Sequence, residues 1–460
     1  MLLALSGLAI LTWFAVAYWT IRPGRVVPVA EAGFWVPALL LTTFFHLPSA
    51  FAVIRTSGTA LIEQGLSSSN LLTIAVVAVS AAFLLWTLVC YDRLLELFGD
   101  RILFPFHLTI GIAIVSTLWA IVPAYTFYRA VELGIMFILV VLTLDRRNFA
   151  EAFINLHVLL LGVWLVISAP EIASSLSKGV VFSSAKHNLI PLLSLSLLWF
   201  VIVVPRTTAY RFAVGLLAIA AFVAAGSAAT VATIPLFVFG SMIAANSIWV
   251  RGAGVLLTVG YFAVFIFLLV GLAQFPDLVD IIAAALQKPP AELLNATGRN
   301  ELWPLFIEAS HNRSFGAGFA SERFLQLLVD FTAVQERLGQ KEIFFNSAHN
   351  MVIGSWLATG WLGLATIAIC LASAFREALR LDTPSRQFII PLILALMANG
   401  MTVQGIFGEF NLHTVTWAAL LVMIRVRLRA RSGTRSRTQS ARAKPGVNAA
   451  SSSGRRRQHA

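Results

Sequence analysis

Charged side chains are scarce in this sequence. Asp, Glu, Lys and Arg make up 12% of its 460 residues, about half of the roughly 25% that is usual in soluble domains. Hydrophobic residues reach 58%, and the mean hydropathy is +0.84. No soluble core needs this much apolar surface. The composition therefore predicts an integral membrane protein that crosses the bilayer several times.

Cysteine and the common catalytic motifs are also scarce. The two cysteines, Cys90 and Cys370, stand in or at the ends of apolar runs, where they form neither a disulfide framework nor a metal-binding spacing. The sequence contains no HExxH, GxSxG or DxD motif and no Cys/His cluster. We therefore expect no metal site and no bound cofactor.

Long apolar runs fill most of the chain. A membrane-spanning helix needs about 20 mostly apolar residues, and a helix satisfies its own backbone amides in lipid. These runs predict an all-α polytopic membrane protein with about 12–13 transmembrane helices and one large outward-facing loop. The predicted segments are 2–21, 33–54, 70–90, 102–121, 126–144, 150–169, 188–204, 212–225, 228–246, 252–274, 350–374, 387–407 and 412–424.

The positive charge is distributed unevenly between the predicted loops. If the C-terminal tail is cytoplasmic, 23 of the 33 Lys and Arg residues fall on its side of the membrane. The positive-inside rule favours this orientation and explains the net charge of +12 without a nucleic-acid partner. The polar stretch 275–350 then faces outward. The inner residues before the tail are Arg22, Arg25, Arg93, Arg101, Arg146, Arg147, Arg206, Arg211, Arg251, Arg376, Arg380 and Arg386.

The same pattern divides the chain into four parts. A transmembrane bundle (1–274) precedes a water-facing loop domain (275–349), and further transmembrane helices (350–424) precede a basic tail (425–460). The tail is rich in Ser, Gly and Ala and poor in aromatics, which predicts disorder. It either anchors the topology or lies against anionic lipid headgroups.

His349 and Asn350 stand where the polar stretch ends and apolar sequence resumes. Because an unperturbed His has a pKa of about 6.5, His349 is a candidate general base. The alternative is an interfacial His with a satisfied ring, or a helix start capped by a nearby polar group. Glu409 and His413 flank the last outer turn and could line the same vestibule.

Several cations stand at predicted outer helix ends. Arg299 would begin a short surface helix, where a guanidinium suits a diphosphate; a solvated or headgroup-bound Arg is the alternative. Arg129 and Glu132 are spaced i and i+3, so they either pair or leave Arg129 to bind an anion. Lys186 and His187 precede another apolar run.

A glycine-rich piece, SFGAGFAS (314–321), lies inside the polar stretch. It lacks the strand and the Lys-Ser/Thr ending of a nucleotide-binding phosphate loop. We interpret it as a tight turn that allows a close approach of the backbone.

Four motifs together resemble the bacterial O-antigen ligase and O-antigen polymerase superfamily, closest to its exopolysaccharide polymerase branch. They are STLWAIVPAYTFYRAVEL (116–133), KHN (186–188), TGRNELW with NRSFGAGF (297–303 and 312–319), and SAHNMVIGSWLATGWLGL (347–364). The order Lys-His is reversed relative to the family. The turn at 224–232 also lacks the Arg that many relatives carry.

This resemblance implies a GT-C-like glycosyltransferase of the bacterial inner membrane, with a periplasmic loop and a cytoplasmic tail. Its donor would be a polyprenyl-diphosphate-linked oligosaccharide and its acceptor a glycan or lipid A core, with membrane lipids and other polysaccharide export proteins as further partners. It implies catalytic roles for His349 and Arg299. The implied diphosphate-binding residues are Arg129, Lys186, His187, Arg313 and Asn350. A transporter or flippase of lipid-linked glycan, or a non-catalytic subunit of an export complex, is the alternative.

Overall fold

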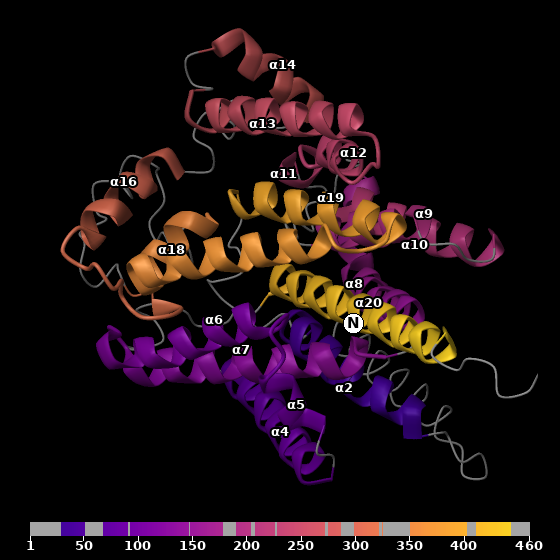
Figure 1. The fold of residues 1–460 in the computed structure, drawn as a ribbon. Helices are drawn as coiled ribbons and strands as arrows, with labels where there is room; N and C mark the ends of the chain where they lie inside the picture. The colour runs from indigo at the N-terminus through magenta and orange to yellow at the C-terminus, as the bar shows by residue number, and fades with distance from the viewer. Residues whose placement is uncertain are drawn as a thin grey trace, which may run out of the picture.

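The computed structural model describes twelve stretches of the chain: residues 29–50, 68–90, 93–146, 148–177, 190–203, 208–225, 228–271, 275–286, 299–321, 324, 350–402 and 411–442. All regular structure within these stretches is helical (Figure 1). The all-α prediction is confirmed to that extent. Helices α6, α7, α18, α19 and α20 run alongside one another (Figure 1).

The helices follow the apolar runs of the sequence. Every predicted segment from 33–54 onward coincides with one helix or with two consecutive ones; segment 2–21 lies outside the described residues. The helices are α2 (Val29–Ala50), α4 (Ser68–Cys90), α5 (Arg93–Phe98), α6 (Phe104–Val115), the 3-10 helix η1 (Ser116–Trp119), α7 (Pro123–Leu144), α8 (Phe149–Ser177), α9 (Ile190–Val203), α10 (Thr208–Ala225), α11 (Ala228–Val231), α12 (Ile234–Ile243), α13 (Ile248–Gly271), α14 (Pro276–Leu286), α16 (Arg299–Ser310), α18 (Met351–Ala378), α19 (Thr383–Gly400) and α20 (Leu412–Arg442).

Four of the described helices are long and apolar enough to cross a membrane. They are α7, α8, the stretch Ile248–Phe267 of α13, and α18. A helix of 22 residues such as α7 is about 33 Å long, which matches a hydrocarbon core of about 30 Å. Other apolar stretches are 10–17 residues long. The number of spans therefore stays a prediction.

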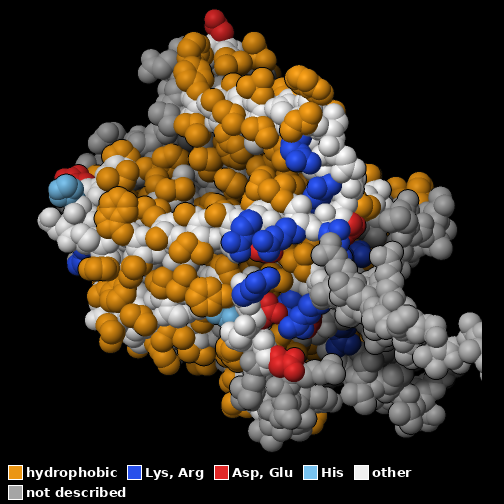
Figure 2. All heavy atoms as spheres, in the orientation of Figure 1, with side chains coloured by type: hydrophobic (Ala, Val, Ile, Leu, Met, Phe, Trp, Pro, Cys, Tyr) orange, Lys and Arg blue, Asp and Glu red, His pale blue; other side chains and the backbone are white. Residues whose placement is uncertain are grey.

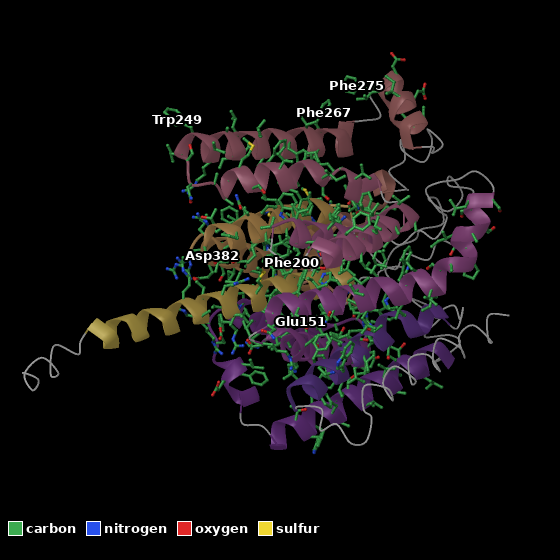
Figure 3. The ribbon with its side chains drawn as sticks, turned by 90° about the vertical axis from the view of Figure 1, so that its right-hand side faces the viewer. Glu151, Phe200, Trp249, Phe267, Phe275 and Asp382 are labelled. Atoms are coloured by element: carbon green, nitrogen blue, oxygen red, sulfur yellow. The ribbon has the colours of Figure 1, made fainter. Side chains whose placement is uncertain are left out.

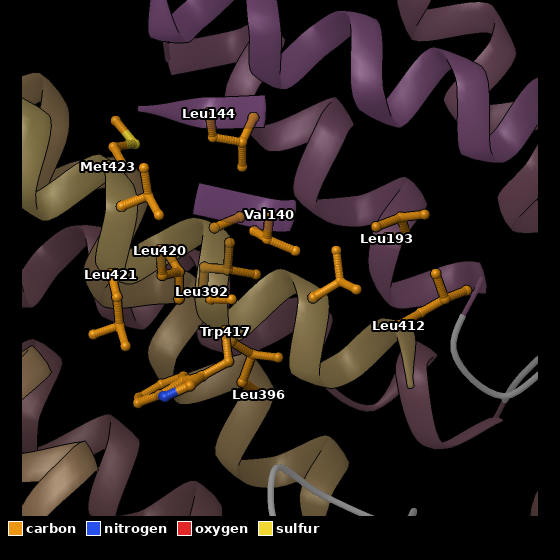
Figure 4. Close-up of a cluster of buried hydrophobic side chains, with 14 of the residues drawn as sticks. Val140, Leu144, Leu193, Leu392, Leu396, Leu412, Trp417, Leu420, Leu421 and Met423 are labelled. Carbon is orange, nitrogen blue, oxygen red and sulfur yellow. The ribbon is translucent and has the colours of Figure 1, made fainter. Parts of the chain in front are cut away.

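Helix α20 supplies the centre of the core. Its residues from Leu412 to Arg425 are all buried, and Trp417 is among the largest fully buried side chains. Figure 4 shows this part of α20 beside apolar side chains of α7, α9 and α19. The predicted segment 412–424 is thus surrounded by protein, although it is the shortest of the predicted segments.

Apolar side chains also cover much of the surface. Trp249 is 86% exposed and Phe267 52% exposed, and both lie along the outer edge of α13 (Figure 3). Phe275 follows at the start of α14, with its ring centroid 5.6 Å from that of Phe267. Figure 2 shows hydrophobic side chains over most of one face. Soluble monomers rarely expose contiguous apolar surface on this scale.

The predicted disorder of the tail requires a correction. Helix α20 continues to Arg442, so residues 425–442 are helical, while residues 443–460 lie outside the described part. Extending a helix that is already packed requires no new nucleation, and Arg has a high helix propensity. Ion pairs of Arg425 and Arg429 with Asp100 further hold this part of α20 in place.

Candidate functional site

Helix α18 is broken at Gly360. This residue has φ of 60° and ψ of −140°, a backbone conformation that side chains other than glycine rarely adopt. A Cβ atom at this position would lie 1.9 Å from the carbonyl oxygen of Ser314. The break interrupts the i to i−4 ladder of α18, so carbonyl groups before it need other partners.

The turn after α16, residues 310–321, supplies those partners. The amide of Ala317 donates to the carbonyl of Leu357 (2.6 Å), and the amide of Gly318 donates to that of Ala358 (2.8 Å). In return, the amide of Trp361 donates to the carbonyl of Ser314 (3.2 Å). A loop distant in sequence thus completes the backbone hydrogen bonding of a broken helix.

Two glycines permit this approach. Gly316 has φ of 74° and Gly318 has φ of 99°. A Cβ atom on Gly316 would lie 2.6 Å from the carbonyl carbon of Ala358, and one on Gly318 would lie 2.3 Å from the Cβ atom of Ala120. The interpretation of SFGAGFAS as a tight turn with close backbone contact is confirmed.

The other side of the turn packs against η1 and the start of α7. The amide of Phe319 donates to Oγ of Ser116 (3.0 Å), and the amide of Ile121 donates to the carbonyl of Ala317 (2.9 Å). The hydroxyls of Thr126 and Ser321 are hydrogen-bonded at 2.7 Å, and both side chains are buried. Trp119 Nε1 also donates to the carbonyl of Phe315 (2.6 Å).

Residues 316–321 are therefore buried between α7 and α18. The sequence led us to expect the whole polar stretch to face water, so this part differs from the expectation. The difference has a physical cause. Irregular backbone is tolerated inside protein when its amides and carbonyls find partners there, and α18 and η1 provide them.

Parts of three of the four sequence motifs meet at this junction. The first motif provides Ser116 and Thr126, the third provides the turn 312–319, and the fourth provides the break at Gly360. The second motif (186–188) lies outside the described residues. Sequence reasoning missed the break itself, because a Gly within a helical pattern is tolerated at a cost of only about 1 kcal/mol relative to Ala.

Arg129 lies one helical turn beyond Thr126 on the same face of α7. Its guanidinium forms an ion pair with Glu132, and both residues are buried, at 6% and 0% exposure. The structural interpretation, that the two residues pair, is realised in this structure. Arg129 would have to exchange Glu132 for a bound anion before it could hold a diphosphate.

Asn350 caps the start of α18. Its Oδ1 accepts the amides of Val352 (2.9 Å) and Ile353 (3.1 Å), and its Nδ2 donates to the carbonyl of Met401 (3.1 Å). An Asn cap of this kind stabilises a helix by about 1 kcal/mol. Asn350 therefore has a structural role at the start of α18.

Two of the predicted site residues, Arg313 and Arg299, lie in the turn after α16 and at the start of α16, respectively. Arg313 is half-buried in the turn, where its carbonyl accepts the amide of Gly316 (2.8 Å). Arg299 begins α16, and its side chain lies outside the described part. Helix α16 packs beside the start of α18, where Trp356 Nε1 donates to Oγ of Ser310 (2.7 Å).

The remaining candidates fall outside the described residues or in the core. His349, Lys186, His187 and Glu409 are among residues that the structure does not describe. His413 is fully buried and bonds through Nε2 to the carbonyl of Leu396 (2.9 Å). The expectation that His413 lines an outer vestibule is therefore wrong. The residue stands one position inside the buried part of α20, and its ring faces the backbone of α19.

Within the described stretches, no group of three or more His, Cys, Asp or Glu side chains is arranged to hold a metal ion. Comparison with protein-family models, with curated protein sequences and with solved structures finds no match for this chain.

Proposed function

We propose that this chain is a polytopic, GT-C-like glycosyltransferase at the outer face of the bacterial inner membrane. Its donor is a polyprenyl-diphosphate-linked glycan, which it polymerises or ligates to another glycan or to lipid A core. The observation that carries the proposal is the junction at Gly360, where three motifs that resemble the superfamily lie in mutual contact. Membrane insertion by itself requires only apolar runs, and it does not require these motifs to lie in contact.

The proposed reaction is a single displacement at the anomeric carbon. An acceptor hydroxyl forms the new glycosidic bond as the bond to the lipid diphosphate breaks, and the diphosphate departs with the bonding electrons. His349 takes the proton of the hydroxyl, and Arg299 stabilises the charge on the departing diphosphate. Lys186, His187, Arg313 and Asn350 assist in holding the donor, and Arg129 joins them after release from Glu132.

Turnover by the purified protein tests this proposal. The full chain is given a polyprenyl-diphosphate oligosaccharide in EDTA as wild type, His349→Ala and Arg299→Ala. Arg376→Gln, an exposed substitution at the other end of α18, serves as the control. We expect longer lipid-linked chains from wild type and control. We expect at least a hundredfold loss in the other two variants, because proton transfer contributes about 10²–10⁴-fold and a group that stabilises developing charge about 10²–10³-fold.

Release of polyprenyl diphosphate only in the presence of a second acceptor identifies a ligase instead of a polymerase. Equal turnover in all four proteins contradicts the roles of His349 and Arg299. Absence of turnover in wild type contradicts the proposal that this chain is an enzyme.

One observation favours a second candidate, a transporter or flippase of lipid-linked glycan. Transporters characteristically contain discontinuous membrane helices, and α18 is discontinuous at Gly360. This candidate predicts translocation of a fluorescent lipid-linked oligosaccharide across vesicles without any change in its chain length. It also predicts that His349→Ala leaves the rate of translocation unchanged.

A further inference from the structure

A cavity of about 490 Å³ lies at the other end of α18 from the junction. It is open to solvent and is lined by the end of α5, the turn between α5 and α6, the end of α18, and α20. This volume is within the range of about 300–1,000 Å³ that is typical of small-ligand sites. Its charged lining residues are Glu96, Asp100, Arg101, Glu377, Arg380 and Arg429. Figure 2 shows Lys and Arg side chains gathered on one part of the surface, with acidic side chains among them.

Two of the three acids in this cavity already have cationic partners. Glu377 pairs with Arg376 (2.8 Å) and with Arg380 (3.0 Å). Asp100 pairs with Arg429 (3.0 Å) and with the buried Arg425 (2.6 Å). Neither carboxylate therefore presents an uncompensated negative charge to a ligand.

One basic and one acidic residue of the lining have no described partner in an ion pair. Arg101 and Glu96 are exposed, and neither forms an ion pair with any residue that the structure describes. Arg380 and Arg429 each keep about half of the side chain exposed, at 54% and 51%. The cavity thus offers guanidinium groups for an anion, together with one separate carboxylate for a cation.

Exposed apolar residues stand beside the lining residues in the sequence. Phe98 precedes the lining residue Gly99, and Phe104 follows Ile102 by two positions; each ring is 55% exposed. Leu379 stands next to Arg380 and is 40% exposed. A ligand that combines charges of both signs with apolar chains matches this composition.

We propose that this cavity binds the headgroup of a zwitterionic phospholipid that contains a phosphodiester and a primary ammonium group. Arg101, Arg380 and Arg429 hold the phosphate, Glu96 holds the ammonium, and the acyl chains lie along Phe98, Phe104 and the outer face of α18. Basic pockets between membrane helices bind the phosphates of lipid headgroups, and Glu96 adds a partner for the ammonium group. The inference goes beyond the proposed function, since it rests on membrane insertion and not on glycosyl transfer.

Native mass spectrometry of the detergent-purified full chain tests this inference. The protein is mixed with dioleoyl phosphatidylethanolamine, dioleoyl phosphatidylglycerol or dioleoylglycerol. The variants are Arg101→Gln, Arg380→Gln, Glu96→Gln and, as the matched control, Arg376→Gln. Arg376 and Arg380 both pair with Glu377, but only Arg380 lines the cavity.

We expect wild type to retain phosphatidylethanolamine about fivefold better than phosphatidylglycerol, which corresponds to one ionic contact. Glu96→Gln is expected to abolish this preference. Arg101→Gln and Arg380→Gln are expected to lower the retention of both phospholipids about fivefold, since a surface cation contributes about that factor. Arg376→Gln should match wild type, and dioleoylglycerol should not be retained.

Three results would overturn the inference. The first is an equal loss in Arg376→Gln and Arg380→Gln, which would mean that surface charge alone attracts the lipid. The second is equal retention of both phospholipids by wild type. The third is displacement of the lipid by an equimolar amount of inorganic phosphate, which would indicate a soluble phosphorylated ligand. Arg101→Gln removes no described ion pair, so it remains informative if Arg380→Gln fails to fold.

Discussion

At the scale of single residues, two of the three glycines of α18 have opposite roles. Gly360 has a positive φ, and its missing Cβ leaves room for the carbonyl of Ser314. Gly354 lies in the same helix, and a Cβ atom added to it would meet nothing within 4 Å. The two positions therefore separate the effect of helix propensity from the effect of docking the turn.

We predict that Gly360→Ala lowers the free energy of unfolding by at least about 2 kcal/mol, because it combines left-handed backbone strain with a steric clash. Gly354→Ala is expected to be neutral or to stabilise the protein by up to about 1 kcal/mol. Melting temperatures in detergent, followed by fluorescence-detected size exclusion, measure both changes. Equal melting temperatures for the two variants would contradict the role given to Gly360.

A second residue-scale feature is the ionic cluster around Arg425. The Arg425 side chain is 1% exposed and forms ion pairs with both Asp100 and Asp145. It therefore links α20 to the loops that precede α6 and α8. Removing one partner of a buried ion pair costs about 3 kcal/mol, because the other charge stays buried. We predict a loss of this size for Arg425→Gln in urea unfolding. The control is Arg427→Gln, two residues further along α20; an equal loss there would argue against the cluster.

The same cluster predicts a dependence of stability on pH. Burial raises the pKa of Asp100, but hydrogen bonds from Arg425 and the amide of Ile102, with the charges of Arg425 and Arg429, outweigh burial and hold the pKa below its usual 3.8. A carboxyl group whose pKa is lowered by folding stabilises the protein above its unfolded pKa, and this contribution is lost as pH falls through the folded pKa.

We therefore expect the melting temperature of wild type to fall more steeply below about pH 4 than that of Asp100→Asn, which lacks the contribution at every pH. Asp277→Asn, at an exposed position on α14, should follow the wild-type profile. Parallel profiles for wild type and Asp100→Asn would show that the ion pair does not contribute to acid stability.

At the scale of elements, the junction joins a broken helix, a glycine-rich turn and the η1–α7 connection. Its main-chain bonds run from the turn to α18 and from the turn to Ile121, and the Thr126–Ser321 bond adds a side-chain link. Buried hydroxyl pairs of this kind depend on both partners being present, because a single hydroxyl left behind is unsatisfied.

A double-mutant cycle tests this link between elements. We predict that Thr126→Val and Ser321→Ala each destabilise the protein by about 1–2 kcal/mol, and that the double variant loses about 1 kcal/mol less than the sum. Thr143→Val serves as the control, because its hydroxyl bonds to Leu139 within α7 itself. Strict additivity between positions 126 and 321 would show that the turn does not dock on α7 in solution.

At the scale of the whole molecule, the two ends of α18 differ in character. One end packs beside α16 and the turn that contains His311, and the other carries Arg376 and Arg380 next to the cavity. Between them, exposed residues of α18 such as Trp361 and Ile369 are apolar. This distribution fits a helix that crosses a bilayer. From the positive-inside rule we predict that its basic end is cytoplasmic.

Labelling of intact cells tests this orientation. In a Cys90→Ser background, we predict that a membrane-impermeant maleimide modifies His311→Cys from outside and modifies Arg376→Cys only after lysis. Cys370 is buried and should stay unlabelled in the folded protein. The reverse labelling pattern would show that the predicted orientation is wrong. The proposed location of the reaction, at the outer face of the membrane, would then be wrong as well.

The sequence by itself determined where the helices lie. From segment 33–54 onward its apolar runs coincide with helices, because each helix satisfies its backbone locally and needs only its own residues to do so. It also located Asn350 at the start of α18 and a tight turn at residues 314–321. Both features depend on local chemistry, a capping amide and glycine backbone freedom, which adjacent residues encode.

Only the tertiary structure decided which of these pieces meet. Docking of the turn into the break at Gly360 joins residues about 45 positions apart, and the pairing of Arg425 with Asp100 spans 325 positions. Neither contact can be recognised from neighbouring residues in the sequence. Gly360 alone resembles any other glycine in a helix, and Arg425 and Asp100 alone resemble solvated charges. Helix α20 also continued past Arg425, where composition indicated disorder, because a packed helix and distant carboxylates stabilise a segment that its own composition does not.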